Sequence, residues 1–250
     1  MKHFLLTDAP DPAGCYRITG NDYHYLARVR RLKIGAEFHA VTPDGTAVRL
    51  RVREIDDSCI TTESIFIDQK PEELPRILLF QALPKSAAMD MIVRQAAEAG
   101  VVEIFPFISG FSVPKESEGK VERWSRIIKA ARQQSGSPVP TKIHDPASFS
   151  GMLNRWNDIQ TRYNSSVGLL LDPESAEKDP FHHYLTPVPD CVVLAVGPEG
   201  GFSPAESKQF RDAGFHPARL GNTILRADTA SVAAVAVVRL ILLESPTLSY

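Results

Sequence analysis

The sequence predicts an α/β domain that follows a smaller all-β domain, and three observations lead to this prediction. Up to about residue 67, short segments alternate apolar and polar side chains, which is typical of half-buried strands. Residues 68–75 are polar, contain two prolines and have no periodicity, as a linker does. Beyond them, apolar runs alternate with helical patterns. We therefore divide the chain into residues 1–70, a linker at 71–75, and residues 76–250.

The all-β domain contains four expected strands. They cover residues 36–41, 47–53, 59–62 and 64–67. The second of them alternates apolar and basic residues, and the turn sequence Thr42-Pro43-Asp44-Gly45 separates it from the first.

The α/β domain contains expected strands and helices in alternation. Strands are expected at 76–81, 101–107 with an interruption at Pro106, 167–171, 191–196 and 217–220. Helices are expected at 86–99, 120–134, 204–213 and 229–243. A further helix is expected to begin at Pro146, with Asp145 as its cap. The strands at 167–171 and 191–196 are apolar almost throughout, which indicates central strands of a parallel sheet.

Composition excludes several classes of protein. The 28 Lys and Arg residues and 30 Asp and Glu residues give a net charge of −2, which excludes a uniformly basic nucleic-acid coat but allows local basic patches. Three widely spaced cysteines, Cys15, Cys59 and Cys191, exclude a disulfide framework. The apolar stretch from Ser231 to Leu243 is shorter than the roughly 20 residues that span a bilayer. We expect a cytoplasmic protein without a membrane anchor, and without a metal because no histidines have metal-ligand spacing.

Three loops follow strands of the α/β domain at the carboxyl ends, where open α/β sheets bind ligands. They are residues 172–174, 197–201 and 221–226. The middle loop, Gly197-Pro198-Glu199-Gly200-Gly201, has few side chains, so its backbone can approach a flat ligand closely. It matches neither the dinucleotide fingerprint nor the P-loop. On glycine content alone, a tight strand-to-helix turn is an equally good interpretation.

These loops resemble those of the RsmE family of 16S ribosomal RNA uridine N3-methyltransferases, which belongs to the SPOUT superfamily. The matching segments are residues 83–85, 98–101, 130–136, 196–202 and 220–230. The resemblance implies a trefoil-knotted α/β fold behind a PUA-like RNA-binding domain. It also implies S-adenosylmethionine as methyl donor, a homodimer with the active site at its interface, and N3 of a uridine in the small-subunit 16S ribosomal RNA as the acceptor.

The cofactor pocket of that family maps onto ten positions of this sequence. They are Leu170, Leu171, Gly197, Pro198, Glu199, Gly200, Leu220, Gly221, Ile224 and Leu225. The resemblance places the adenine among backbone groups of the loops, with aliphatic side chains against its faces. Four residues depart from the family pattern: Phe111, Ser137 and Asn222 replace basic residues, and Asp228 replaces a glutamate.

Arg226 and Glu199 are the candidate catalytic residues. Methylation of N3 removes the proton of an imide nitrogen, and a guanidinium near the carbonyl oxygens would stabilise the negative charge on the ring. Arg226 could instead form a structural ion pair with Asp228 or Glu199. Glu199 could act as the base or could anchor the next helix through its amides, and Asp228 could cap the last helix.

Two basic segments are candidates for contact with RNA phosphates. The first contains Arg28, Arg30, Arg31 and Lys33. The second, within residues 76–142, contains Lys85, Arg123, Arg126 and Arg132. Such charge runs are usually only solvated surfaces, and the resemblance to an RNA-modifying family favours the RNA interpretation.

The last helix predicts a homodimer. Only Ser231 and Arg239 are polar between Ala230 and Leu243, and a helix that is apolar all round must be covered on every side. Complete burial within one subunit is the alternative.

Two other functions stay open. A knotted methyltransferase with another RNA acceptor is compatible with the changes at Asn222 and Ser137. A non-catalytic RNA-binding factor in ribosome assembly would retain only a vestigial pocket, although the intact glycine loops and Arg226 argue against such decay.

Overall fold

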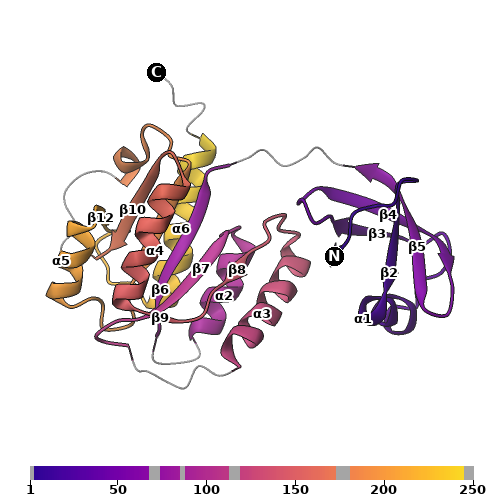
Figure 1. The fold of residues 1–250 in the computed structure, drawn as a ribbon, viewed down its shortest axis with the longest axis horizontal. Coiled ribbons are helices and arrows are strands. Elements are labelled where there is room, and N and C mark those ends of the chain that lie inside the picture. The colour runs from indigo at the N-terminus through magenta and orange to yellow at the C-terminus, as the bar shows by residue number, and fades with distance from the viewer. Residues whose placement is uncertain (1–2, 68–73, 85–87, 113–118, 173–180, 245–250) are drawn as a thin grey trace. The chain divides into compact units, whose positions relative to one another are not determined.

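The computed structural model describes residues 3–67, 74–84, 88–112, 119–172 and 181–244 (Figure 1). The chain forms two compact units. The first unit consists of residues 1–72 and 130–140, and the second of residues 73–129 and 141–250.

The first unit is built on a sheet with strand order β1-β3-β4-β5-β2 in the described residues. The bounds are β1 Phe4–Leu5, β2 Cys15–Thr19, β3 Glu37–Val41, β4 Ala47–Ile55 and β5 Cys59–Ile67. Alternation in β4 places Val48, Leu50 and Val52 in the core and its three arginines on the solvent side. The expected β-sheet of this part of the chain is confirmed, but the unit is not purely β.

The expected strands 59–62 and 64–67 form one continuous strand, β5. A register shift opposite Arg49 and Leu50 pairs these residues with Phe66 and Ser64 and leaves Ile65 as an extra residue. Such a bulge shifts the alternation of side chains by one position, which explains why the sequence suggested two strands. The strands β1 and β2, the short helix α1 (Gly20–Tyr23) and the π-helical segment η1 (His24–Val29) were not predicted.

The second unit is a parallel sheet with strand order β12-β10-β11-β6-β7-β8 in the described residues, and β9 pairs with β7 as well. The bounds are β6 Arg76–Ala82, β7 Glu103–Ile108, β8 Lys142–Ile143, β9 Ala147–Ser148, β10 Ser166–Leu171, β11 Cys191–Val196 and β12 Phe215–Ala218. All six residues of β11 are buried at the centre of the sheet, as its apolar run predicts. Burial raises the pKa of the Cys191 thiol to about 12, so this thiol stays protonated.

Helices cover both faces of this sheet. Their bounds are α2 Ala88–Glu98, α4 Phe149–Arg162, α5 Pro204–Asp212 and α6 Ala227–Glu244, with a short 3₁₀ helix η2 at Phe181–Leu185. The helix α3, Lys120–Ser135, continues from the second unit into the first at residue 130. Figure 1 shows α4 in front of the sheet and α6 behind it, where α6 packs against α2. The aromatic side chains of Phe80, Phe107, Trp156 and Phe210 form one core between the sheet, α4 and α5.

The expected helix start at Pro146 was wrong. Residues Ala147–Ser148 form the strand β9, and α4 begins at Phe149. Ser148 is the cap residue, because its hydroxyl accepts a hydrogen bond from the Gly151 amide at 3.1 Å. Two consecutive capping signals, at 145 and 148, therefore occur in the sequence, and the second one starts the helix.

Two strand predictions also need correction. Pro106 does not interrupt β7, because β8 pairs with residues 103 and 104 and β9 with residues 107 and 108. Pro106 therefore lies in the gap between these two partner strands, where no hydrogen bond from its backbone nitrogen is needed. The last strand covers Phe215–Ala218 rather than 217–220, so Arg219 and Leu220 lie in the loop beyond it.

Candidate active site

A cavity lies at the carboxyl ends of β10, β11 and β12. It has an empty volume of about 620 Å³, counting its open side. Its walls come from the loop after β11, the segment between β12 and α6, and the first turn of α6. Because the strands are parallel, their carboxyl ends bring these distant segments of sequence to one edge of the sheet.

Eight of the ten expected cofactor residues line this cavity. They are Leu171, Gly197, Pro198, Glu199, Leu220, Gly221, Ile224 and Leu225. The structure does not place the other two in the lining. Leu170 is buried in the aromatic core on one face of the sheet. Gly200 lies against Phe111, because a Cβ atom on Gly200 would stand 3.2 Å from Cβ of that residue.

Sequence reasoning missed seven residues of the lining. They are Val196, Gly201, Ala218, Arg219, Thr223, Ala227 and Ala230. Ala227 and Ala230 are three positions apart at the start of α6 and therefore share one helix face. The spacing of these two alanines after Arg226 could have indicated that they belong to the lining. Using that signal requires knowing that the helix begins at Ala227.

The glycine loop after β11 is a tight turn. Gly201 has a φ of +68°, and its amide donates to the Pro198 carbonyl oxygen at 2.9 Å. A Cβ atom on Gly197 would stand 3.1 Å from Cα of Gly201, so a larger residue would displace backbone. The loop therefore presents backbone groups rather than side chains to a ligand in the cavity.

The helix after this loop, α5, has its own cap. The Ser203 hydroxyl accepts a hydrogen bond from the Glu206 amide at 3.3 Å, and the Glu206 carboxylate accepts one from the Ser203 amide at 2.9 Å. This reciprocal capping box anchors the start of α5. Glu206 thus anchors the start of α5, while Glu199 lies in the cavity wall with an exposed side chain.

Arg226 lies between two lining residues, Leu225 and Ala227, and its side chain is 81% exposed. Its Nε atom is 4.0 Å from Oδ1 of Asp228, the outer limit for an ion pair. Such an exposed pair contributes little to stability, so the guanidinium is available to a substrate. Asp228 lies within the first turn of α6 rather than at its cap position, where its charge still favours the helix dipole.

A buried polar pair stands behind the cavity and fixes α6 to the sheet. The Ser231 hydroxyl lies 2.6 Å from Oε1 of Gln81 and 2.7 Å from the Ala227 carbonyl oxygen. The side-chain amide of Gln81 donates to the Ala82 carbonyl oxygen at 2.9 Å. Both side chains are buried, so the first turns of α6 are held against the end of β6.

The first basic segment lies at the end of η1 and just beyond it. Arg28, Arg30, Arg31 and Lys33 are all exposed. Arg31 has a φ of 51°, the left-handed conformation of a tight turn, and Leu26 anchors the segment because it is completely buried. The fold therefore presents all four cations to solvent.

The second basic segment is more varied. Arg123 forms an ion pair with Asp90, and Arg126 is exposed. Arg132 is half-buried, and this burial lowers the pKa of its guanidinium. Lys85 lies outside the described residues.

Comparison with known proteins decides the family. A family profile described as an RNA methyltransferase domain matches residues 71–239, and one described as an RNA methyltransferase PUA domain matches residues 18–62. The ribosomal RNA small subunit methyltransferase E of Aquifex aeolicus is 34% identical over 84% of this chain and 88% of its own length. The chain belongs to the ribosomal RNA small subunit methyltransferase E family.

Other members of the methyltransferase E family support the same assignment. The Synechocystis protein is 30% identical over 90% of this chain and 73% of its own length. The crystal structure of the Neisseria gonorrhoeae enzyme, bound to S-adenosylmethionine, shares the fold with a TM-score of 0.80 at 24% identity, over 96% of this chain and 98% of that one. The resemblance seen in the loop motifs is confirmed, and so are the methyltransferase class and the PUA-like domain before it.

The described residues contain neither a candidate membrane span nor a candidate metal site. Within them, no helix is both long and apolar enough to cross a membrane. Within the same ranges, no three His, Cys, Asp or Glu side chains gather as a metal-binding group.

Proposed function

We propose that this protein transfers a methyl group from S-adenosylmethionine to N3 of a uridine in the 16S ribosomal RNA of the small subunit. The observation that carries the proposal is the cavity between the glycine loop at 197–201 and the segment 219–225, in a chain of the methyltransferase E family. The proposed substrate assigns the protein to the cytoplasm, where ribosomes are assembled.

The cavity suits S-adenosylmethionine by its chemistry. Leu171, Leu220 and Leu225 offer aliphatic contacts for the faces of an adenine ring. The glycine loop offers backbone amides and carbonyls for the edge of the ring. Gly197 lies so close to the backbone of Gly201 that a side chain at position 197 would not fit. Ala227 and Ala230 keep the helix side of the cavity open. When bound, the cofactor supplies an electrophilic methyl group.

Arg226 acts on the uridine rather than on the cofactor. Loss of the N3 proton leaves negative charge on the ring, spread over its two carbonyl oxygens. The exposed guanidinium beside the cavity stabilises that charge. N3 would then take the methyl group as the carbon–sulfur bond of the cofactor breaks, which would leave a neutral thioether and neutralise the ring. Glu199, the carboxylate of the cavity lining, is the candidate base that takes the N3 proton.

The active form is a homodimer that uses α6. Val235, Val238 and Leu242 are buried against the subunit's own sheet and helices, whereas Leu240 is 55% and Leu243 50% exposed. Within the described part of the chain, one apolar stripe of α6 therefore stays exposed, which argues against complete burial within one subunit. A second copy of the chain covers this stripe.

The four departures from the family pattern bear on the acceptor. Ser137 is buried. Asn222 is exposed next to the cavity-lining residues 221 and 223, so its change is the one that favours another RNA acceptor. The test below separates this alternative.

Mapping of modified nucleotides in ribosomal RNA from a strain that lacks the protein tests the proposal. We expect the loss of one 3-methyluridine from 16S ribosomal RNA, restored by the wild-type gene and not by an Arg226→Ala variant. Loss of a different methylated nucleotide would show another acceptor. An unchanged set of modifications together with defective subunit assembly would show a non-catalytic assembly factor.

A further inference from the structure

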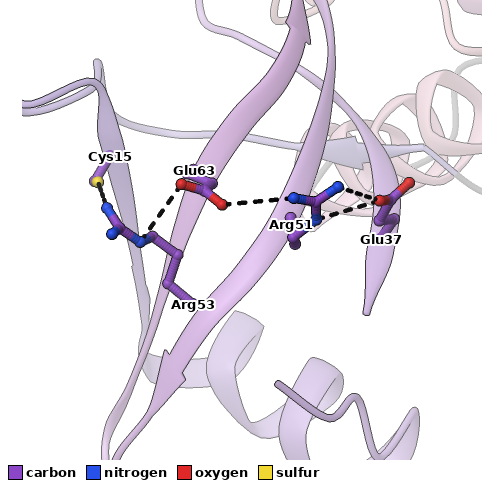
Figure 2. Close-up of polar contacts among 5 residues, drawn as sticks. All are labelled: Cys15, Glu37, Arg51, Arg53 and Glu63. Carbon is purple, nitrogen blue, oxygen red and sulfur yellow. Dashed lines mark hydrogen bonds and ion pairs between the residues drawn. The ribbon is translucent and has the colours of Figure 1, made fainter. Parts of the chain in front are cut away.

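The solvent face of the first unit carries a row of neutralised charges (Figure 2). Arg51 of β4 lies between Glu37 of β3 and Glu63 of β5, at 2.9 Å from one carboxylate and 4.0 Å from the other. Arg53 lies 3.5 Å from Glu63 and donates to Sγ of Cys15 at 3.9 Å. An RNA phosphate at either arginine would have to replace a carboxylate and then lie close to it, so this row is a poor phosphate site.

Arg49 stands on the same strand and the same face but has different neighbours. It pairs across strands with His39 of β3 and Phe66 of β5. Its guanidinium carbon lies 5.8 Å from the centroid of the Phe66 ring. Among the described residues, no carboxylate lies within ion-pair distance of Arg49. Arg49 is exposed and Phe66 is 54% exposed, which is unusual for a phenylalanine that has a core within reach.

We infer that Arg49 and Phe66 form a binding site for an unpaired nucleotide of RNA. Unstacked bases bind to aromatic rings and to the planes of guanidinium groups, and both surfaces are present here side by side. Since no carboxylate of the described residues competes for it, the guanidinium can contact the phosphate of the same or the next nucleotide. An acidic peptide would satisfy the charge of Arg49 but would leave the Phe66 ring uncovered, so RNA fits this pair better.

This inference rests on the proposed function, in which the PUA-like unit binds RNA. It adds that the solvent face of the sheet binds the RNA, through Arg49 and Phe66. The site is distinct from the basic segment at residues 28–33, because it lies on the middle strands of the sheet. It also predicts that the arginines of β4 differ in their effect on RNA binding. Arg51 and Arg53 have carboxylate partners, whereas Arg49 has none in the part of the chain that the structure describes.

The test measures binding of the full-length protein to a short fluorescein-labelled oligouridylate by fluorescence anisotropy at several salt concentrations. Arg49→Ala and Phe66→Ala should each weaken binding by about 5- to 150-fold, the range found for one stacked base. Arg49→Ala should also lower the slope of log affinity against log salt by about 0.7, as expected for one lost phosphate contact on a single strand. Arg51→Ala is the matched control, because it removes the same charge from the same strand and face. It should weaken binding less than Arg49→Ala does, because it removes no stacking or phosphate contact and acts only through the charges of Glu37 and Glu63.

Equal effects of Arg49→Ala and Arg51→Ala, or no effect of Arg49→Ala and Phe66→Ala, overturn the inference. If the wild type still methylates 16S ribosomal RNA in that case, the proposed function stands while this site falls. If the wild type transfers no methyl group yet binds RNA in an Arg49-dependent way, the site stands and the proposed function falls. Absence of RNA binding by the wild type overturns both.

Discussion

The Glu206 carboxylate accepts a hydrogen bond from the Gly110 amide at 2.7 Å and so joins two loops at the carboxyl edge of the sheet. Its other oxygen accepts hydrogen bonds from the amide and the hydroxyl of Ser203 at 2.9 and 2.8 Å. The residue is only 8% exposed, so these donors replace the water that would otherwise solvate its charge. The loop after β7, including Phe111, is thereby held beside the glycine loop of the cavity.

Replacement of this carboxylate should loosen the cavity wall. The amide nitrogen of glutamine cannot accept a hydrogen bond, so Glu206→Gln should lower the free energy of unfolding by about 1–3 kcal/mol. We expect kcat/KM for methyl transfer to fall by about tenfold or more, because displaced positioning groups are costly. Lys208→Ala is the control on the same helix, since Lys208 forms only an exposed ion pair with Asp212. Equal activity of the two variants would show that the link to Gly110 has no role in the reaction.

Two glycines of one loop should differ in their effect on the cofactor. A methyl group on Gly197 would meet the backbone of Gly201, whereas one on Gly200 would meet the side chain of Phe111, which is 46% exposed and can move. Gly197→Ala should therefore weaken S-adenosylmethionine binding by about tenfold or more, which corresponds to about 1.4 kcal/mol, and Gly200→Ala by much less. Isothermal titration calorimetry without added metal measures both. The reverse order of effects would contradict the assignment of the cavity wall.

Arg226→Ala should reduce methyl transfer by about 10²-fold or more while cofactor affinity stays the same, because the guanidinium stabilises charge on the acceptor base. Single-turnover transfer from labelled S-adenosylmethionine gives the rate, and calorimetry gives the affinity. Arg211→Ala, which removes an exposed arginine of α5, is the control. Full activity of the Arg226 variant would return this side chain to a structural role.

A charge on the exposed stripe of α6 should separate the subunits without unfolding them. Leu240 is 55% exposed in a single subunit but would be buried in the proposed dimer. Leu240→Glu therefore places a charge that the single subunit tolerates and the dimer interface does not. Light scattering should show a wild-type mass near twice the 27.6 kDa of the chain and a variant mass near 27.6 kDa. Gln160→Glu adds the same charge on the exposed side of α4 and should leave the mass unchanged. A wild type that is monomeric at micromolar concentration and active refutes the dimer.

Glu103 should make stability depend on acidity. It is hydrogen-bonded to Nε2 of His144 at 2.7 Å and to Nη1 of Arg162 at 2.6 Å, and the bond to His144, followed by the charge of Arg162, lowers the pKa of the Glu103 carboxyl. Because the pKa is lower in the folded state, ionised Glu103 contributes to the free energy of unfolding. This contribution is fully present above the glutamate pKa of the unfolded chain, about 4.3, and is lost as the pH falls through the pKa of the folded state.

Glu103→Gln removes this contribution. At pH 7 the variant should be less stable than the wild type by about 1.5–3 kcal/mol, the range for hydrogen bonds to charged groups. The difference should persist down to about pH 5 and shrink below about pH 4. Urea unfolding across this range measures it. A difference that does not change with pH would mean that the ionised form of Glu103 is not what stabilises the fold.

The sequence allowed good prediction where burial alone decides the structure. The strand β11 was predicted to the residue, because all six of its side chains are apolar and buried. The helix α3 was predicted within one residue of its end, with Trp124, Ile128 and Ala131 on its buried side. The start of α4 was wrong because two capping signals compete locally, and only pairing of β9 with β7 selects the second.

The same limit applies to the site. The loop motifs identified eight lining residues, since those loops carry the resemblance to the family. Glu206 was missed because its partner Gly110 is 96 positions away in the sequence, and no spacing rule connects them. The trefoil knot stays a prediction, because periodicity and burial describe elements and not the threading of the chain.

The most direct measurement is methylation in vitro with identification of the product nucleoside. Purified protein would be incubated with S-adenosylmethionine and small ribosomal subunits from the strain that lacks it, and the 16S ribosomal RNA digested and analysed by mass spectrometry. The proposed function predicts one new 3-methyluridine per RNA, absent without the cofactor and strongly reduced with Arg226→Ala. Failure to transfer a methyl group, or its transfer to a different atom or base, would contradict it.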